Sequence, residues 1–332
     1  MKPLVYGLIF FTALVVATGL SIWLGPVDLT SAQILETLRG EGPSENLYIV
    51  REIRGPRTIL AIMVGGGLAL AGAVFQALLR NPLAEPYILG ISSGAATGAV
   101  LVLSLGLVAS QAWTLPAAAF IGSLLAISIV LAVSSNHSQK IDVQVLLLAG
   151  VVTGAFFSAC ISLILTLSDA PNLRSAVLWM MGSLSGAEWS TVTVVSVYTF
   201  PCVIILLGLA RPLNLLTIGE DTANYLGVKV ERVKLTGYIV ASLMTAAGVA
   251  ATGIIGFVGL IVPHGIRLLI GNDYRFLLPL CFLCGATFLT LADTLSRILI
   301  SPAEIPVGVV TALFGVPAFL WLLRRNMKTR RS

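Results

Sequence analysis

The sequence predicts an all-α integral membrane protein with about ten transmembrane helices. Of its 332 residues, 57% are hydrophobic and 11% are charged, whereas soluble domains carry roughly 25% charged residues. The 32 glycines are typical of helices that pack closely in lipid. The net charge of +5 does not indicate nucleic-acid binding, because the basic residues lie in short loops and a tail.

Ten apolar segments are the expected spans, since a helix needs roughly 20 apolar residues to cross a bilayer. The first segment is too long for the apolar core of a signal peptide and lacks a clear cleavage site. One apolar run, 235–270, must hold two spans joined near Gly253 and Gly256, so the eighth span is expected to be short. The ten segments form a single domain, 1–332, and are 4–24, 57–79, 88–108, 114–134, 142–167, 191–209, 235–255, 256–270, 276–297 and 306–324.

The basic residues predict the orientation, because cytoplasmic loops of membrane proteins are rich in Lys and Arg. With the N-terminus inside, the cytoplasmic side holds 14 of the 20 basic residues and the outer side holds 6. Both termini are then cytoplasmic, and so is the polar interval 211–234. Two outer loops, 25–56 and 168–190, are long enough to hold structure of their own.

An internal repeat is also expected, with half-repeats of roughly 57–167 and 235–324. Span 2 would run inward and span 7 outward, so the repeat would be inverted, as in many transporters. A chance match in a sequence rich in Gly and Ala is the alternative. A shift of 181 residues places Gly67, Ala69, Gly72, Pro82 and Gly90 on Gly248, Ala250, Gly253, Pro263 and Gly271.

The segment RPLNLLTIGEDTANYLGVKVERVK, 211–234, contains a predicted short helix. Gly219 permits a turn, and Glu220 and Asp221 then lie in a first turn, where the helix dipole favours negative charge. Gly227 suits the position just after a helix. A helix of roughly two turns is not stable alone in water, so a partner is expected to pack on it.

Other motifs predict packing rather than chemistry. Gly90, Gly94 and Gly98 recur every fourth residue and form a strip that lets helices approach closely. Cys281 and Cys284 lie in an apolar run and are interpreted as small apolar residues, and His137 and His264 are too isolated to predict a metal site. The sequence has no GxxxxGK[ST] phosphate loop and no HExxH motif. Ionisable residues within the spans are rare, Asp293 beside Arg297 being the exception, so an ion-coupled carrier is not favoured.

Several motifs together resemble the FecCD-type permease family, the membrane subunits of ATP-driven importers for iron–siderophore, haem and vitamin B12. The resemblance covers nearly the whole chain, in order and at the right spacing. The motifs are NPLAEP at 81–86 followed by Gly90, WMMGSL at 179–184, GEDTANYLG at 219–227, GLIVPH at 259–264 and PVGVVTALFGVPAF at 306–319.

The resemblance implies the type II ABC importer permease fold and an assembly in the plasma membrane of a bacterium or archaeon. A homodimer of this chain would bind two ATPase subunits, which hold ATP and Mg, and a substrate-binding protein outside. This chain itself would need no cofactor. The helix in 219–227 would be the coupling helix that docks on the ATPase, with its acids facing basic groups of that subunit. The coupling residues are Gly219, Glu220, Asp221, Asn224, Tyr225, Leu226 and Gly227.

The resemblance also implies two further sets of residues. Arg54, Arg57 and Arg297 would lie exposed on the outer face and receive carboxylates of the binding protein. Asn81 and Leu83, together with Val143 and Gln144, would close the cytoplasmic exit. The family has small hydroxyl residues at the latter pair, and Val143 and Gln144 depart from that pattern.

The predicted function is therefore inward transport of a metal chelate. An iron–siderophore complex is the favoured substrate, and haem and cobalamin are the alternatives. Two rivals come from other classes. A secondary transporter would work without ATP, and the shortage of acids in the spans argues against it. A membrane-embedded enzyme is disfavoured because the motifs of such enzymes were not found.

Overall fold

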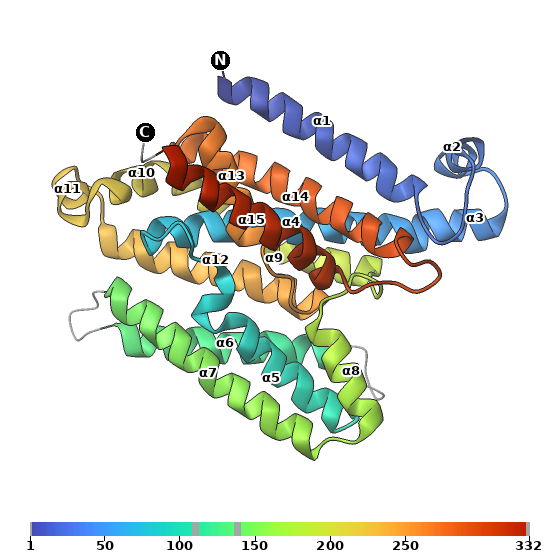
Figure 1. Cartoon of the computed structure of the whole chain (residues 1–332), viewed down its shortest axis with the longest axis horizontal. Helices are drawn as coiled ribbons and strands as arrows, with labels where there is room; N and C mark the ends of the chain where they lie inside the picture. The colour runs from blue at the N-terminus through green and yellow to red at the C-terminus, as the bar shows by residue number, and fades with distance from the viewer. Residues whose placement is uncertain (1, 108–112, 136–140, 330–332) are drawn as a thin grey trace.

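The computed structural model describes residues 2–107, 113–135 and 141–329, and its regular structure is helical throughout these ranges except for two isolated β-bridges (Figure 1). Seven of the described helices are long and apolar enough to cross a membrane, and three shorter apolar helices accompany them. Each of the ten predicted spans coincides with one of these helices, which confirms the all-α membrane fold. They are α1 (Lys2–Trp23), α4 (Gly55–Leu78), α5 (Ile91–Ser104), α6 (Thr114–Ser134), α7 (Val143–Leu167), α9 (Trp189–Gly208), α12 (Val230–Thr252), α13 (Val258–Ile270), α14 (Tyr274–Ile298) and α15 (Val307–Thr329).

Shorter helices lie at the two ends of this bundle. At one end are α10 (Ala210–Ile218) and α11 (Glu220–Tyr225). At the other end, both predicted outer loops are folded. They contain α2 (Ser31–Arg39), α3 (Ser44–Tyr48), the π-helical turn η1 (Ile49–Arg54) and α8 (Ala170–Met180). Figure 1 shows the start of α1 and the end of α15 toward the end that carries α10 and α11, away from α2 and α3.

Helix α4 is the centre of the larger helix group. It is apolar on every side and almost wholly buried, as expected of a helix surrounded by other helices. It packs against α14, α12, α13 and α9. Glycines permit this, because a Cβ at Gly65 would overlap the backbone of Gly285 in α14 and a Cβ at Gly72 would overlap Gly259 in α13. A second group, α5 to α7, lies beside it (Figure 1).

Two of the apolar helices are too short to cross a bilayer alone. Helix α5 has 14 residues and α13 has 13, about 20 Å each against a hydrocarbon core of about 30 Å. The prediction of a short eighth span is confirmed. The short third span was not predicted. Its start is set by Gly90, whose left-handed φ of 76° separates α5 from the 3-10 turn η2 (Pro86–Leu89).

The connection between α4 and α5 covers the start of α13. The Glu85 carboxylate accepts a hydrogen bond of 2.6 Å from the backbone N–H of Phe257, just before α13. The Tyr87 hydroxyl donates to the carbonyl of Ile255, and the Gln76 amide donates to the carbonyls of Ala84 and Leu260. These side chains supply partners to backbone groups where α12 has ended and α13 begins.

The predicted glycine strip does not face one neighbour. Gly94 and Gly98 lie against α6, where a Cβ would overlap the carbonyls of Gly122 and Ala118. Gly90 lies before the helix and faces α7, with the Gly150 carbonyl 3.2 Å from its ideal Cβ position. The prediction of close packing is confirmed at all three glycines, but the single continuous strip is wrong, because α5 begins only after Gly90.

The order of helix lengths supports an internal repeat. Helices α4 to α7 have 24, 14, 21 and 25 residues, and α12 to α15 have 23, 13, 25 and 23. The predicted register of 181 residues is wrong, however. It pairs Pro82, in the α4–α5 connection, with Pro263 inside α13. Gly67 and Ala69 of α4 still pair with Gly248 and Ala250 of α12, but Gly90 precedes α5 whereas Gly271 follows α13.

We expect Gly94→Leu to prevent stable assembly, because even a Cβ at this position overlaps the carbonyl of Gly122 and lies 2.8 Å from the Cβ of Ala126. Overpacking of this kind typically costs about 1–3 kcal/mol or more. The measurement is the yield of monodisperse protein in detergent. Gly19→Leu in α1 is the matched control, since nothing lies within 4 Å of its Cβ position. A stable Gly94→Leu protein would contradict the packing shown here.

Candidate functional site

Helix α11 projects from the end of the bundle and has the features predicted for it. It covers Glu220 to Tyr225, with both acids in its first turn. Gly219 precedes it with φ 153° and ψ 145°, and Gly227 follows it with φ 85°. Both backbone conformations favour glycine. Ala223 is buried, whereas Tyr225 is 92% exposed and Leu226 is exposed beside it. The helix therefore presents an aromatic and an aliphatic side chain to a partner.

The rest of the 211–234 interval is not a polar loop. Helix α10 buries Leu213 and Leu216, and its Asn214 amide donates a 2.8 Å hydrogen bond to Asp273, the residue that caps α14. Hydrogen bonds from Arg275 hold the pKa of Asp273 well below its usual value, so this cap is ionised throughout the physiological range. The projecting helix α11 thus follows α10, which packs on the bundle through buried leucines and the hydrogen bond to Asp273.

The Glu220 side chain has partners within this chain, and its contact with an ATPase stays a prediction. Its carboxylate points to the bundle, 3.0 Å from Lys234 in α12 and 3.2 Å from Arg80 at the end of α4. Asp221 is exposed, as predicted. Asp221 is therefore the more exposed of the two acids, while Glu220, with 33% of its side chain exposed, ties α11 to two spans.

The four predicted gate residues occupy two places. Val143 and Gln144 begin α7 and line a cavity of about 590 Å³, together with Arg80, Glu220 and Lys234. Asn81 and Leu83 lie in the α4–α5 connection, where the Asn81 side chain accepts a 3.0 Å hydrogen bond from the Leu83 N–H. Leu83 is exposed. The structure thus places Val143 and Gln144, but not Asn81 and Leu83, beside the charged residues that contact α11. The gating role of all four stays a prediction.

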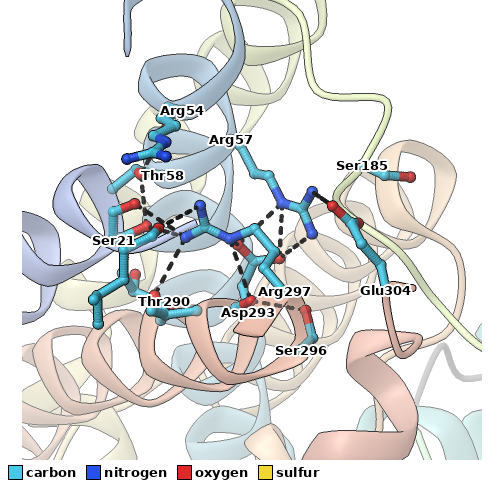
Figure 2. Close-up of polar contacts among 12 residues, drawn as sticks. Ser21, Arg54, Arg57, Thr58, Ser185, Thr290, Asp293, Ser296, Arg297 and Glu304 are labelled. Carbon is cyan, nitrogen blue, oxygen red and sulfur yellow. Dashed lines mark hydrogen bonds and ion pairs between the residues drawn. The ribbon is translucent and has the colours of Figure 1, made fainter. Parts of the chain in front are cut away.

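The end of the bundle that carries α2 and α3, the predicted outer end, holds a cluster of charges around the buried Asp293 (Figure 2). Arg57 pairs with Asp293 at 2.9 Å and with Glu304 at 3.0 Å. Arg297 lies one turn after Asp293, 3.3 Å from its carboxylate, and donates to the Ser21 hydroxyl and the Leu24 carbonyl. Asp293 is fully buried between the two guanidinium groups. The cluster links α4, α14, the end of α1 and the α14–α15 connection.

The predicted exposure of the three outer arginines is wrong. Arg54, Arg57 and Arg297 are between 3% and 5% exposed. Arg54 donates to the carbonyls of Ile22, Trp23 and Val27, which end α1 and begin the outer loop. Because all three guanidinium groups already have internal partners, this geometry gives them a structural role, and docking of a binding protein stays a prediction.

Sequence reasoning missed the acids and bases that complete these clusters. At the α11 end they are Arg80, Glu231 and Lys234, and at the predicted outer end Glu304. The one available signal was the i,i+3 spacing of Glu231 and Lys234, which allows an ion pair on a helix. Ionisable residues close to a span also deserve a functional hypothesis by default. His137 lies outside the described residues, as do Lys140, Arg330 and Arg331, which were counted for the orientation.

We expect Asp293→Asn to destabilise the protein by about 3–5 kcal/mol, because it leaves two buried guanidinium groups with one carboxylate fewer. The measurement is thermal unfolding in detergent. Asp169→Asn is the control, since Asp169 is exposed and such changes usually stay within about 0.5 kcal/mol. Equal unfolding temperatures for both variants would contradict the structural role. By the same reasoning, Arg57→Glu lowers stability and does not isolate a docking effect.

Comparison with known proteins agrees with this architecture. The model of the FecCD transport family matches residues 13–325. The hemin transport system permease protein HmuU of Yersinia pestis is 45% identical over 85% of each chain. The vitamin B12 import system permease protein BtuC of Salmonella typhi is 39% identical over 92% of this chain and 89% of its own. A solved structure described as an inward-facing metal-chelate type ABC transporter is 34% identical, with a TM-score of 0.86 over 95% of this chain and 97% of its own. This chain belongs to the FecCD transport family and is an ABC transporter permease.

Proposed function

We propose that this permease moves an iron–siderophore complex from the outside to the cytoplasm, powered by a separate ATPase. Two copies of the chain would form the pathway, two ATPase subunits would dock at α11, and a binding protein would deliver the substrate at the end that carries α2 and α3. Both termini would then be cytoplasmic. The observation that supports the ATP-driven part of the proposal is α11 itself, a six-residue helix between two glycine turns with Tyr225 almost fully exposed.

The wall available to a substrate is apolar. A groove of about 620 Å³ is bounded by α8, the α12–α13 junction and α15, and its lining carries no ionisable side chain. Such a wall suits a large chelate that must pass without being held by hydrogen bonds or charges. The lining residues are Met180, Met181, Ile254, Gly256, Phe257, Gly308, Val309, Ala312, Leu313, Val316 and Pro317.

Haem and cobalamin are the second candidates. Relatives at 39–45% identity are named as hemin and vitamin B12 permeases, and the apolar groove is compatible with each of these large chelates. Proteoliposomes that contain the permease, its ATPase and its binding protein distinguish the three. Uptake of a ferric siderophore with ATP inside, and none with haem or cyanocobalamin, is the expected result. Transport of haem or cyanocobalamin instead would show that the proposed iron–siderophore substrate is wrong. Uptake without ATP would indicate a secondary transporter.

We expect Gly227→Val to abolish ATP-driven uptake while the protein remains folded. The residue has φ 85°, which a β-branched side chain resists, so the chain must leave α11 in a different direction. Gly219→Val acts in the same way at the start of the helix. The measurements are uptake and co-purification with the ATPase. Gly186→Val is the control, because Gly186 is exposed with open space around it. Normal uptake by both α11 variants would refute the docking role of this helix.

A further inference from the structure

A polar cluster around Lys234 joins α11 to the start of α7. Lys234 lies in the second turn of α12 and is 4% exposed. Its ammonium group is 3.0 Å from Glu220 of α11 and 2.8 Å from Glu231 of its own helix. It also donates a 2.7 Å hydrogen bond to the backbone carbonyl of Ile141. One buried cation of α12 therefore contacts two other segments, α11 and the residue that precedes the cap of α7.

Glu231 completes the link to α7. Its second carboxylate oxygen accepts a 2.8 Å hydrogen bond from the backbone N–H of Ile141, so two side chains of α12 hold both polar backbone groups of that residue. Ile141 directly precedes Asp142, which caps α7 by accepting a 2.8 Å hydrogen bond from the Gln144 N–H. The place where α7 begins is consequently set by Lys234 and Glu231.

The cluster is electrically balanced, and Lys234 is its one buried member. Arg80 and Lys234 supply two positive charges, and Glu220 and Glu231 supply two negative ones. Removing one partner from a buried ion pair leaves an uncompensated charge, which is strongly unfavourable. A displacement of Glu220 with α11 removes one of the two carboxylates that contact the buried ammonium group, so Lys234 must either follow Glu220 or keep only Glu231 and the Ile141 carbonyl.

We propose that Lys234 is the positioning residue that transmits movement of α11 to the start of α7, and so to the cavity lined by Val143 and Gln144. This inference rests on the proposed function, in which a docked ATPase moves α11. Lys234 makes no contact with the substrate groove described above. Its role is to make α11 and the start of α7 change position together, so that the two segments act as one two-state element of a rigid-body transition.

The test measures the cavity directly and does not depend on the identity of the substrate. A cysteine is introduced by Gln144→Cys in a chain whose four native cysteines are replaced by alanine. The permease is assembled with its ATPase in nanodiscs. The rate of labelling by a membrane-impermeant maleimide is then measured without nucleotide and with a non-hydrolysable ATP analogue. With Lys234 present, we expect the analogue to change the rate by about fivefold or more.

Lys234→Met should remove this nucleotide response. Glu220→Gln, which weakens the contact with α11, and Glu231→Gln, which weakens the contact with Ile141, should each remove it as well. Lys234→Arg should restore most of it, because a guanidinium group can reach the same acceptors. Lys229→Met is the matched control, since Lys229 is exposed at the start of the same helix. Each variant is used only after size-exclusion chromatography shows that the complex with the ATPase is intact.

The outcomes separate this inference from the proposed function. An unchanged nucleotide response in Lys234→Met overturns the positioning role while leaving ATP coupling in place. A loss of response in Lys229→Met as large as in Lys234→Met also overturns it. If the parent complex forms but shows no response at Gln144→Cys, the link to α7 is refuted. If no ATPase binds to the parent chain, the proposed function itself fails.

Discussion

The structure depends on one constraint of the bilayer, that every backbone polar group within it must find a partner inside the protein. Continuous helices such as α4 and α7 meet this requirement by themselves. Helices α5 and α13 do not, because each begins after an interruption of the regular backbone. The side chains of Gln76, Glu85 and Tyr87 supply the missing partners there. The α4–α5 connection thus supplies hydrogen-bond partners to the backbone at the start of α13. This explains the structural role of Glu85 in the motif at 81–86.

Close approach of helix backbones is the second consequence of the lipid environment. Apolar side chains gain little from leaving lipid for a protein interior, so contact area and fit between helices must hold the bundle together. Gly65 and Gly285 bring α4 against α14, and Gly94 and Gly122 bring α5 against α6. These contacts leave no space for a Cβ, so the backbones of each pair of helices lie in direct contact.

Charges are concentrated at the two ends of the bundle and serve different purposes. At the end that carries α2 and α3, Asp293 is enclosed by Arg57 and Arg297, which fastens α4 to α14 and to the end of α1. At the α11 end, Lys234 is buried but its partners are partly exposed, and the cluster borders a cavity. The first arrangement resists change, whereas the second can exchange partners. The α11 end is therefore the better place for a movable connection.

The sequence by itself determined the elements whose cause is local. Apolar runs of sufficient length specify the spans, and Gly219 and Gly227 bound α11 because their backbone conformations favour glycine. The tertiary structure decided which charged side chains meet. Arg57 and Asp293 are 236 residues apart, and Lys234 and Ile141 are 93 apart, so no spacing rule could pair them. For that reason the burial of Arg54, Arg57 and Arg297, which were predicted as exposed docking residues, was not foreseen. The contact of Glu220 with Lys234 was not foreseen either. Burial and pairing depend on how separate segments pack, and only the folded chain contains that information.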